Sequence, residues 1–260
     1  MKKIFFILML ILGLGSCSNA FRDLPDKSSD QYYIDQARIF LNEFKFTEAI
    51  AKIMPVLESQ PRNPEVVEIA ILAHAGRAGL RVLDLILELG SDSGSVSFFK
   101  IFAQHFPNAD DDDIADMQTA ISILETYEPN EVVRSSELNM IAMFLYYGRI
   151  GVVLHRYAYE DNVLSPTFNQ CSTTDLPDVD LTYIVQSIPK ALNASSYISD
   201  ADGVSSALSA LTDLPEIQFF IGSEESVCPT NQAPCQSMRS LIGEGALNIG
   251  LGAGVAASCP

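Results

Sequence analysis

Residues 30–165 carry a helical periodicity that limits this chain to a small group of folds. Apolar side chains recur three and four positions apart, as they do at Ile114, Met117, Ile121 and Leu124. This spacing gives a helix one apolar stripe, which it must bury against other helices. Breaker and capping residues interrupt the pattern near positions 45, 79, 113 and 147, and again near positions 61, 95, 129 and 163. We therefore expect an all-α region of about four helical hairpins.

The first hairpin, residues 32–63, resembles a tetratricopeptide repeat, a helix–turn–helix unit with a period of about 34 residues. The small, aromatic and closing positions of that repeat are occupied by Ala37, Phe40, Phe46, Ala49 and Pro61. The resemblance implies an irregular solenoid of stacked hairpins, in which the later copies keep the period but few signature residues. Pro55 falls inside the second helix, where we expect a break or a kink. An unrelated helical bundle whose turns match the period by chance is the alternative.

The first 16 residues read as an export signal. Lys2 and Lys3 precede an unbroken apolar run at residues 4–12, which is too short to span a bilayer. The run ends in a motif that resembles the lipobox of bacterial lipoproteins, made by Leu14, Gly15, Ser16 and Cys17. This resemblance implies cleavage after Ser16 and acyl chains such as palmitate on Cys17, which anchor the protein in a membrane. The alternative is an ordinary secretory signal with a chance cysteine.

The same lipoprotein resemblance predicts a location on the periplasmic side of the bacterial outer membrane. Ser18 follows the cysteine, whereas an aspartate there usually retains such proteins in the inner membrane. The chain carries a net charge of −17, and the signal that is removed contains only basic charges. Such an acidic protein repels nucleic acid and anionic lipid headgroups. We therefore expect no nucleic-acid partner and a membrane contact made through lipid alone.

Four further cysteines lie in the C-terminal third of the chain: Cys171, Cys228, Cys235 and Cys259. An even number in an exported protein predicts two disulfides, for which three pairings exist. We favour Cys228 with Cys235 across a short loop and Cys171 with Cys259. A zinc site is the weaker alternative, because the cysteines lack Cys-x₂-Cys spacing and the histidines lie far away in the sequence.

These features divide the chain into four regions. They are a signal peptide at 1–16, a lipidated flexible tether at 17–29, helical repeats at 30–165, and a disulfide-stapled helical region at 166–260 that caps the last repeat. Within the last region, Asp202 is expected to cap a helix. The glycine-rich end at 237–258 is expected to form a buried helix, with a membrane helix as the alternative.

No familiar catalytic motif is present, so we expect neither an enzyme nor a cofactor. The run Asp110–Asp113 could bind calcium, but acids at the start of a helix cap its free N–H groups, and we favour that reading. His155, Arg156 and Tyr157 could line a pocket, although a surface patch is the simpler interpretation. A buried histidine paired with a carboxylate would reopen the question of catalysis.

Two functions fit these observations. The first is a membrane-anchored scaffold that binds a protein or peptide in the bacterial envelope, as in assembly, secretion or pilus systems. The second is a component that binds a small apolar ligand, because the chain more loosely resembles the tetratricopeptide-like lipoproteins associated with TRAP-type transporters. An apolar tunnel through the helices would favour transport, and a closed core with an open groove would favour a scaffold.

Overall fold

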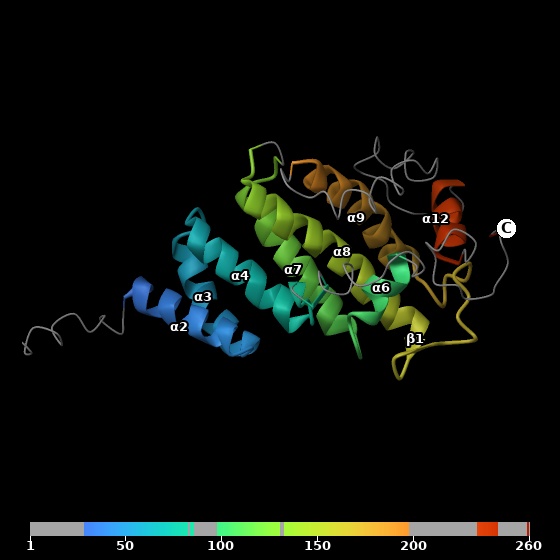
Figure 1. Cartoon of the computed structure of the whole chain (residues 1–260), viewed down its shortest axis with the longest axis horizontal. Helices are drawn as coiled ribbons and strands as arrows, with labels where there is room; N and C mark the ends of the chain where they lie inside the picture. The colour runs from blue at the N-terminus through green and yellow to red at the C-terminus, as the bar shows by residue number, and fades with distance from the viewer. Residues whose placement is uncertain are drawn as a thin grey trace, which may run out of the picture.

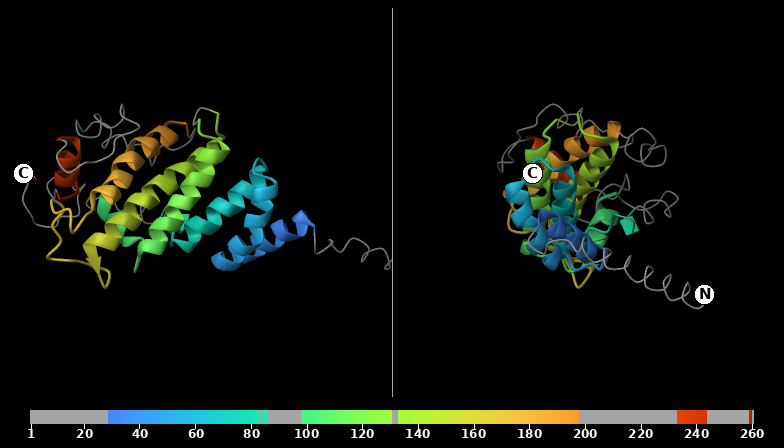
Figure 2. Two further views of the ribbon diagram at one scale, coloured as in Figure 1. Left: turned by 180° about the vertical axis from the view of Figure 1, so that it is seen from behind. Right: turned by 90° about the vertical axis from the view of Figure 1, so that its left-hand side faces the viewer.

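The computed structural model describes residues 29–82, 84–85, 98–130, 133–197, 233–243 and 259, and these residues form an all-α fold. Most of the helices follow one another along the long axis of the molecule, from α2 at one end to α12 at the other, whereas α6 lies beside α8, beyond α7 (Figure 1). The view from behind shows the same order (Figure 2). The two short strands, β1 (Tyr159–Glu160) and β2 (Val163–Leu164), form an antiparallel hairpin at the end of α8. The signal, Cys17 and the tether up to residue 28 lie outside the described residues.

The first three helices pack as a sequential array. They are α2 (Asp30–Asn42), α3 (Phe46–Ser59) and α4 (Pro64–Arg77). Asn63 caps α4 by accepting a hydrogen bond from the amide of Glu65, and Pro64 supplies the fixed φ that suits a first helical position. A separate small core, which includes Ile34, Ile53 and Val66, joins all three helices. The predicted turns near residues 45 and 61 are therefore confirmed.

The next helices continue the array. They are α6 (Phe98–Gln104), α7 (Asp111–Tyr127), α8 (Ser136–Ala158), α9 (Asp178–Ser196) and α12 (Ala233–Gly243). Helix α7 packs on α4, and α8 packs on α6, α7 and α9. Asp110 accepts hydrogen bonds from the amides of Asp112 and Asp113 at 2.9 and 3.1 Å, and its own amide donates to the Asp113 carboxylate. This reciprocal cap confirms the helix-capping interpretation of the acidic run.

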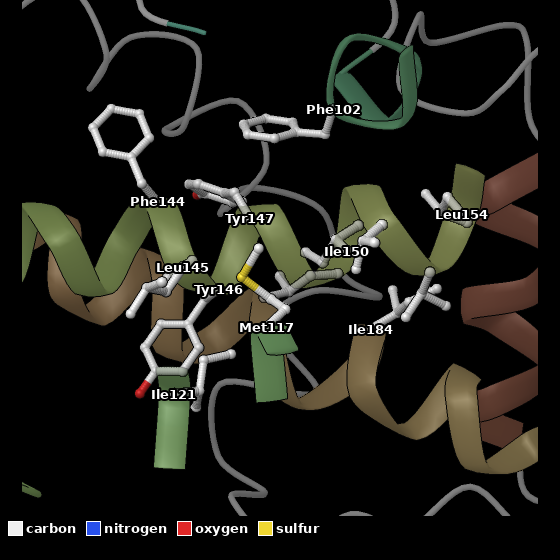
Figure 3. Close-up of a cluster of buried hydrophobic side chains, with 14 of the residues drawn as sticks. Phe102, Met117, Ile121, Phe144, Leu145, Tyr146, Tyr147, Ile150, Leu154 and Ile184 are labelled. Atoms are coloured by element: carbon white, nitrogen blue, oxygen red, sulfur yellow. The ribbon is translucent and has the colours of Figure 1, made fainter. Parts of the chain in front are cut away.

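Helix α8 is the centre of the main core. Its aromatic residues Phe144 and Tyr147 lie on the side of Phe102, whose ring centroid is 4.9 Å from that of Tyr147 (Figure 3). Met117 of α7 and Ile184 of α9 pack on the other side of α8 (Figure 3). Among the described helices, α8 is also long and apolar enough to cross a membrane, but most of it is buried inside the protein. It therefore has the surroundings of a globular core helix.

The turn expected near Tyr147 is wrong, because α8 runs through that position without interruption. Gly148 and Gly151 serve close packing instead. A Cβ atom at Gly151 would lie 2.5 Å from the backbone oxygen of Phe102, so only glycine lets α6 approach so closely. The turn expected at Asp113 is displaced as well, since this residue stands in the first turn of α7.

The break expected at Pro55 is also wrong, because α3 continues past it to Ser59. Pro55 lacks the N–H group that would bond to the carbonyl of Ala51. Both residues are exposed, so water can replace the missing hydrogen bond.

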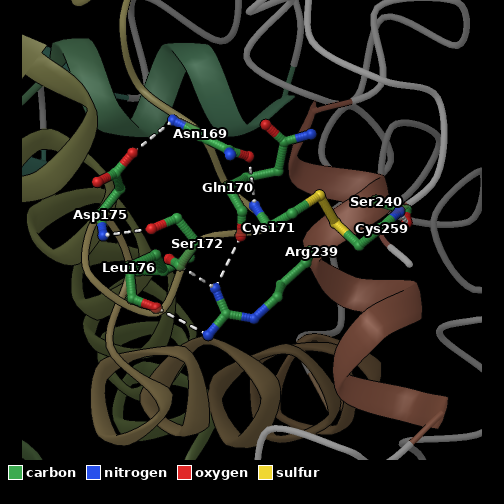
Figure 4. Close-up of a disulfide and its surroundings, with 9 residues drawn as sticks. All are labelled: Asn169, Gln170, Cys171, Ser172, Asp175, Leu176, Arg239, Ser240 and Cys259. Carbon is green, nitrogen blue, oxygen red and sulfur yellow. Dashed lines mark hydrogen bonds between the residues drawn. A yellow bond between two sulfur atoms is a disulfide. The ribbon is translucent and has the colours of Figure 1, made fainter.

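The C-terminal region is fastened to the loop between β2 and α9. Cys171 and Cys259 form a disulfide that joins residues 88 positions apart, which agrees with the favoured pairing (Figure 4). Cys235 is also disulfide-bonded, but its partner lies outside the described residues. Cys228 is outside the described residues too, so its predicted pairing with Cys235 stays a prediction. The buried guanidinium of Arg239 donates to the carbonyl oxygens of Gln170 and Leu176 at 2.7 and 2.8 Å. The predicted helix around residue 202 and the glycine-rich end after residue 243 are not within the described part.

Candidate functional site: a groove along helices α4 and α7

Two hollows that share lining residues open on the surface between α3, α4, α7 and α8, and we refer to them together as the groove. The first has a volume of about 380 Å³, and the second has a volume of about 270 Å³. Both are lined by Val67 of α4 and Tyr127 at the end of α7, which places them side by side. The groove follows from the direct packing of α7 on α4, because the ends of four elements meet there.

The first hollow is lined mainly by apolar and small hydroxyl side chains. Leu57 and Pro61 border it from the α3 side, and Ile123 and Thr126 border it from α7. Pro61, Ser122 and Thr126 are exposed at its rim, so the hollow opens to solvent. Of the predicted repeat signature, Pro61 is the residue that contributes to this groove.

The second hollow adds acidic groups to an apolar floor. Val67, Leu138 and Ile141 supply apolar surface, and the solvent-facing carboxylates belong to Glu68 and Glu137. Val133 stands at the edge with 65% of its surface exposed, which is unusual for a large aliphatic side chain beside a hollow. The remaining lining residues of the second hollow are Pro64, Tyr127, Glu128, Arg134 and Ser135.

The charge on this second hollow is negative wherever it meets solvent. Arg134 also lines it, but Arg134 is buried, and its Nε donates to the backbone oxygen of Glu128 at 2.8 Å. Hydrogen bonds from its own backbone amide and from the Ser135 hydroxyl lower the pKa of Glu137. Glu137 therefore stays ionised throughout the neutral range, whereas the guanidinium of Arg134 is buried and does not face solvent.

A third hollow, of about 440 Å³, lies at the opposite end of α4 and α7. Its lining is polar and carries both signs of charge, from Arg77, Arg81, Asp84, His105 and Asp113. The Nε2 atom of His105 accepts a hydrogen bond from the amide of Arg81 at 3.2 Å. These mixed charges do not select one sign of ligand.

A buried histidine is paired with a carboxylate between α4 and α7, the arrangement that would reopen the question of catalysis. His74 Nδ1 lies 3.0 Å from Asp116 Oδ1, and Arg77 donates to both oxygens of Asp116 at 2.5 Å. His74 Nε2 is buried and contacts no hydrogen-bonding group in the described part of the chain. Among the described residues, no hydroxyl or thiol contacts this nitrogen, and the three side chains link α4 to α7 through hydrogen bonds.

We predict that Asp116→Asn lowers the free energy of unfolding by about 1–2 kcal/mol at pH 7, because it removes charge-assisted hydrogen bonds from a half-exposed Arg77. Burial alone would raise the pKa of Asp116, but the hydrogen bonds from Arg77 and His74 lower it below its usual value. The stabilisation is therefore complete above the unfolded pKa and is lost as the pH falls through the folded pKa. Urea unfolding at several pH values measures this, and an equal difference at pH 7 and about pH 3 would contradict it.

The other residues singled out in the sequence have structural positions. Ala37 and Ala49 are fully buried in α2 and α3, and the ring of Phe46 occupies the space where Gly76 has no side chain. Phe40 is half-buried in α2. The expectation of a surface patch at His155 is wrong for that residue, since it is buried, and its Nδ1 lies 2.8 Å from the Ala103 oxygen.

No family model matches the chain, and no curated protein or solved structure shows significant similarity to it.

Proposed function

We propose that this protein is a lipid-anchored scaffold of the bacterial envelope, which binds a partner protein through the groove along α4 and α7. The open groove beside a filled core is the observation that carries this proposal. The core around α8 is occupied by large side chains such as Phe102, Tyr146 and Tyr147, which are fully buried. A surface of this kind suits recognition of another chain better than enclosure of a small molecule.

The sequence supports the envelope location and the repeat architecture in this proposal. The motif ending at Cys17 resembles a lipobox, and the disulfide between Cys171 and Cys259 suits an oxidising compartment. The succession of α2, α3 and α4 has the helix–turn–helix–turn order of a tetratricopeptide-like solenoid. In such an array each helix pair leaves surface free for a partner.

Small-molecule transport is the competing function, and it calls for an enclosed apolar cavity. The hollows lined by described residues have exposed residues at their rims, as at Pro61 and Thr126. The described geometry therefore favours the scaffold.

A pull-down from solubilised envelope membranes tests the proposal. Thr126→Trp places an uncharged bulky ring at the exposed rim of the groove, and we expect it to reduce capture of the partner at least tenfold. Ala115→Trp is the matched control, because Ala115 is exposed on the same helix and lies outside the groove lining. Cys17→Ala should capture the same partner but lose the membrane anchor, which mass spectrometry of the mature N-terminus detects.

Equal capture of the partner by the wild type and by Thr126→Trp would show that the partner does not bind at the groove. If no protein co-purifies and native mass spectrometry finds a retained small molecule, the scaffold proposal fails and the transport component replaces it.

A further inference from the structure

We infer that the groove selects a basic amphipathic segment of its partner, whose apolar side chains enter the hollows while Lys or Arg side chains meet the acidic end. This inference rests on the proposed function and identifies the chemistry of the partner. It follows from the unequal distribution of charge and apolar surface along the groove.

Acidic side chains gather around the second hollow. Glu68 on α4 and Glu137 on α8 both face solvent around the second hollow, and Glu128 lies at the turn between α7 and α8. In the described part of the chain, Glu68 forms no ion pair, and the hydrogen bonds to Glu137 come from its own amide and from Ser135. Their negative charge is therefore available to a cation on a partner.

Three cations of the described helices and loops already have partners within the protein. The charged head of Arg134 is turned to the interior, as its contact with the Glu128 oxygen shows. Arg62 donates to the Tyr127 carbonyl at 2.7 Å, where it complements the C-terminal end of α7. Lys190 of α9 pairs with Glu125, the residue before Thr126 of the groove lining, at 2.6 Å. These three cations thus have acceptors within the protein, whereas Glu68 and Glu137 form no ion pair in the described part of the chain.

Apolar side chains line both hollows. The first hollow carries no ionisable side chain apart from Tyr127, and its lining includes Leu57, Val67 and Ile123. Val133 adds exposed apolar surface to the lining of the second hollow. A segment that occupies both hollows therefore meets apolar surface in the first and both apolar and acidic surface in the second. A segment that carries both apolar and basic side chains complements that lining.

Synthetic peptides test this inference with the full mature chain. We would measure fluorescence anisotropy with an amphipathic leucine–lysine peptide and with its leucine–glutamate counterpart. The lysine peptide is expected to bind, and its affinity should fall several-fold when the salt concentration rises from about 0.05 to about 0.5 M, because the contacting charges are exposed. The glutamate peptide is expected to bind at least tenfold more weakly.

Charge reversal separates the groove from the general acidity of the protein. Glu68→Lys should weaken binding of the lysine peptide roughly three- to tenfold, since an attraction becomes a repulsion. Glu58→Lys makes the same change in net charge at an exposed position of α3 outside the groove lining, and it should change the affinity less than about twofold.

Equal effects of Glu68→Lys and Glu58→Lys, or equal binding of the two peptides, would overturn the inference. The proposed function would then still stand if Thr126→Trp abolishes capture from the envelope. If neither peptide binds and Thr126→Trp leaves capture unchanged, both the inference and the proposed function fail.

Discussion

Replacing both Cys171 and Cys259 by serine is expected to lower the free energy of unfolding by about 4 kcal/mol. The disulfide closes a loop of 88 residues, and a loop of that length removes much conformational entropy from the unfolded chain. The native structure of the region is expected to persist in the variant, because other contacts also hold it. Arg239 stays bonded to Gln170, Leu176 and Asp178, so the loop before α9 keeps its contact with α12.

Urea unfolding of the purified double variant against the wild type measures this difference. Treatment of the wild type with a reductant is a poor substitute, because Cys235 is disulfide-bonded too and would be reduced in the same step. Hydrogen exchange supplies the spatial control. Protection should fall in residues 165–177 and remain unchanged in α2 and α3, which belong to the separate small core. A loss of stability below about 1 kcal/mol would show that Arg239 and the surrounding packing hold this region by themselves.

The sequence predicts those features that depend on neighbouring residues. The turn at Gly79 is confirmed, with a positive φ of 91° that suits glycine. The cap formed by Asp110 and Asp113 is also confirmed, because its donors and acceptors lie within three residues of one another. The all-α fold follows from the same local periodicity. The tetratricopeptide-like solenoid and the lipid anchor at Cys17 stay predictions.

The candidate site depends on tertiary contacts, which no local pattern reveals. His74 and Asp116 are separated by 42 residues and meet because α7 packs directly on α4. Glu68 and Glu137 border one hollow for a similar reason. In the sequence each is an ordinary helix-surface acid, and the nearest local signal is the apolar Val133 beside the Glu128–Pro129–Asn130 turn. Periodicity separates buried from exposed faces, but it does not tell which exposed faces converge.

The role of a glycine is likewise not evident from its sequence context, and a substitution at one glycine is expected to have the second large effect on stability. A glycine in a sequence marks either a turn, as at Gly79, or a close helix contact, as at Gly151. We predict that Gly151→Ala lowers the free energy of unfolding by about 2–3 kcal/mol. The new Cβ would lie 2.5 Å from the backbone oxygen of Phe102 and 2.7 Å from the ring of Phe106, so α6 must move away from α8.

Gly148→Ala is the matched control, because it lies in the same helix and makes the same chemical change. There the nearest atom to the new Cβ is the terminal methyl of Met117 at 3.0 Å, and a methionine end can rotate aside. Alanine also favours a helix over glycine by about 1 kcal/mol, so this variant is expected to be neutral or slightly stabilised. Thermal and urea unfolding of the two variants compare them directly. If Gly151→Ala is as stable as Gly148→Ala, α6 does not approach α8 as closely as the carbonyl contact at Phe102 requires, and helix propensity alone would set the stability of both variants.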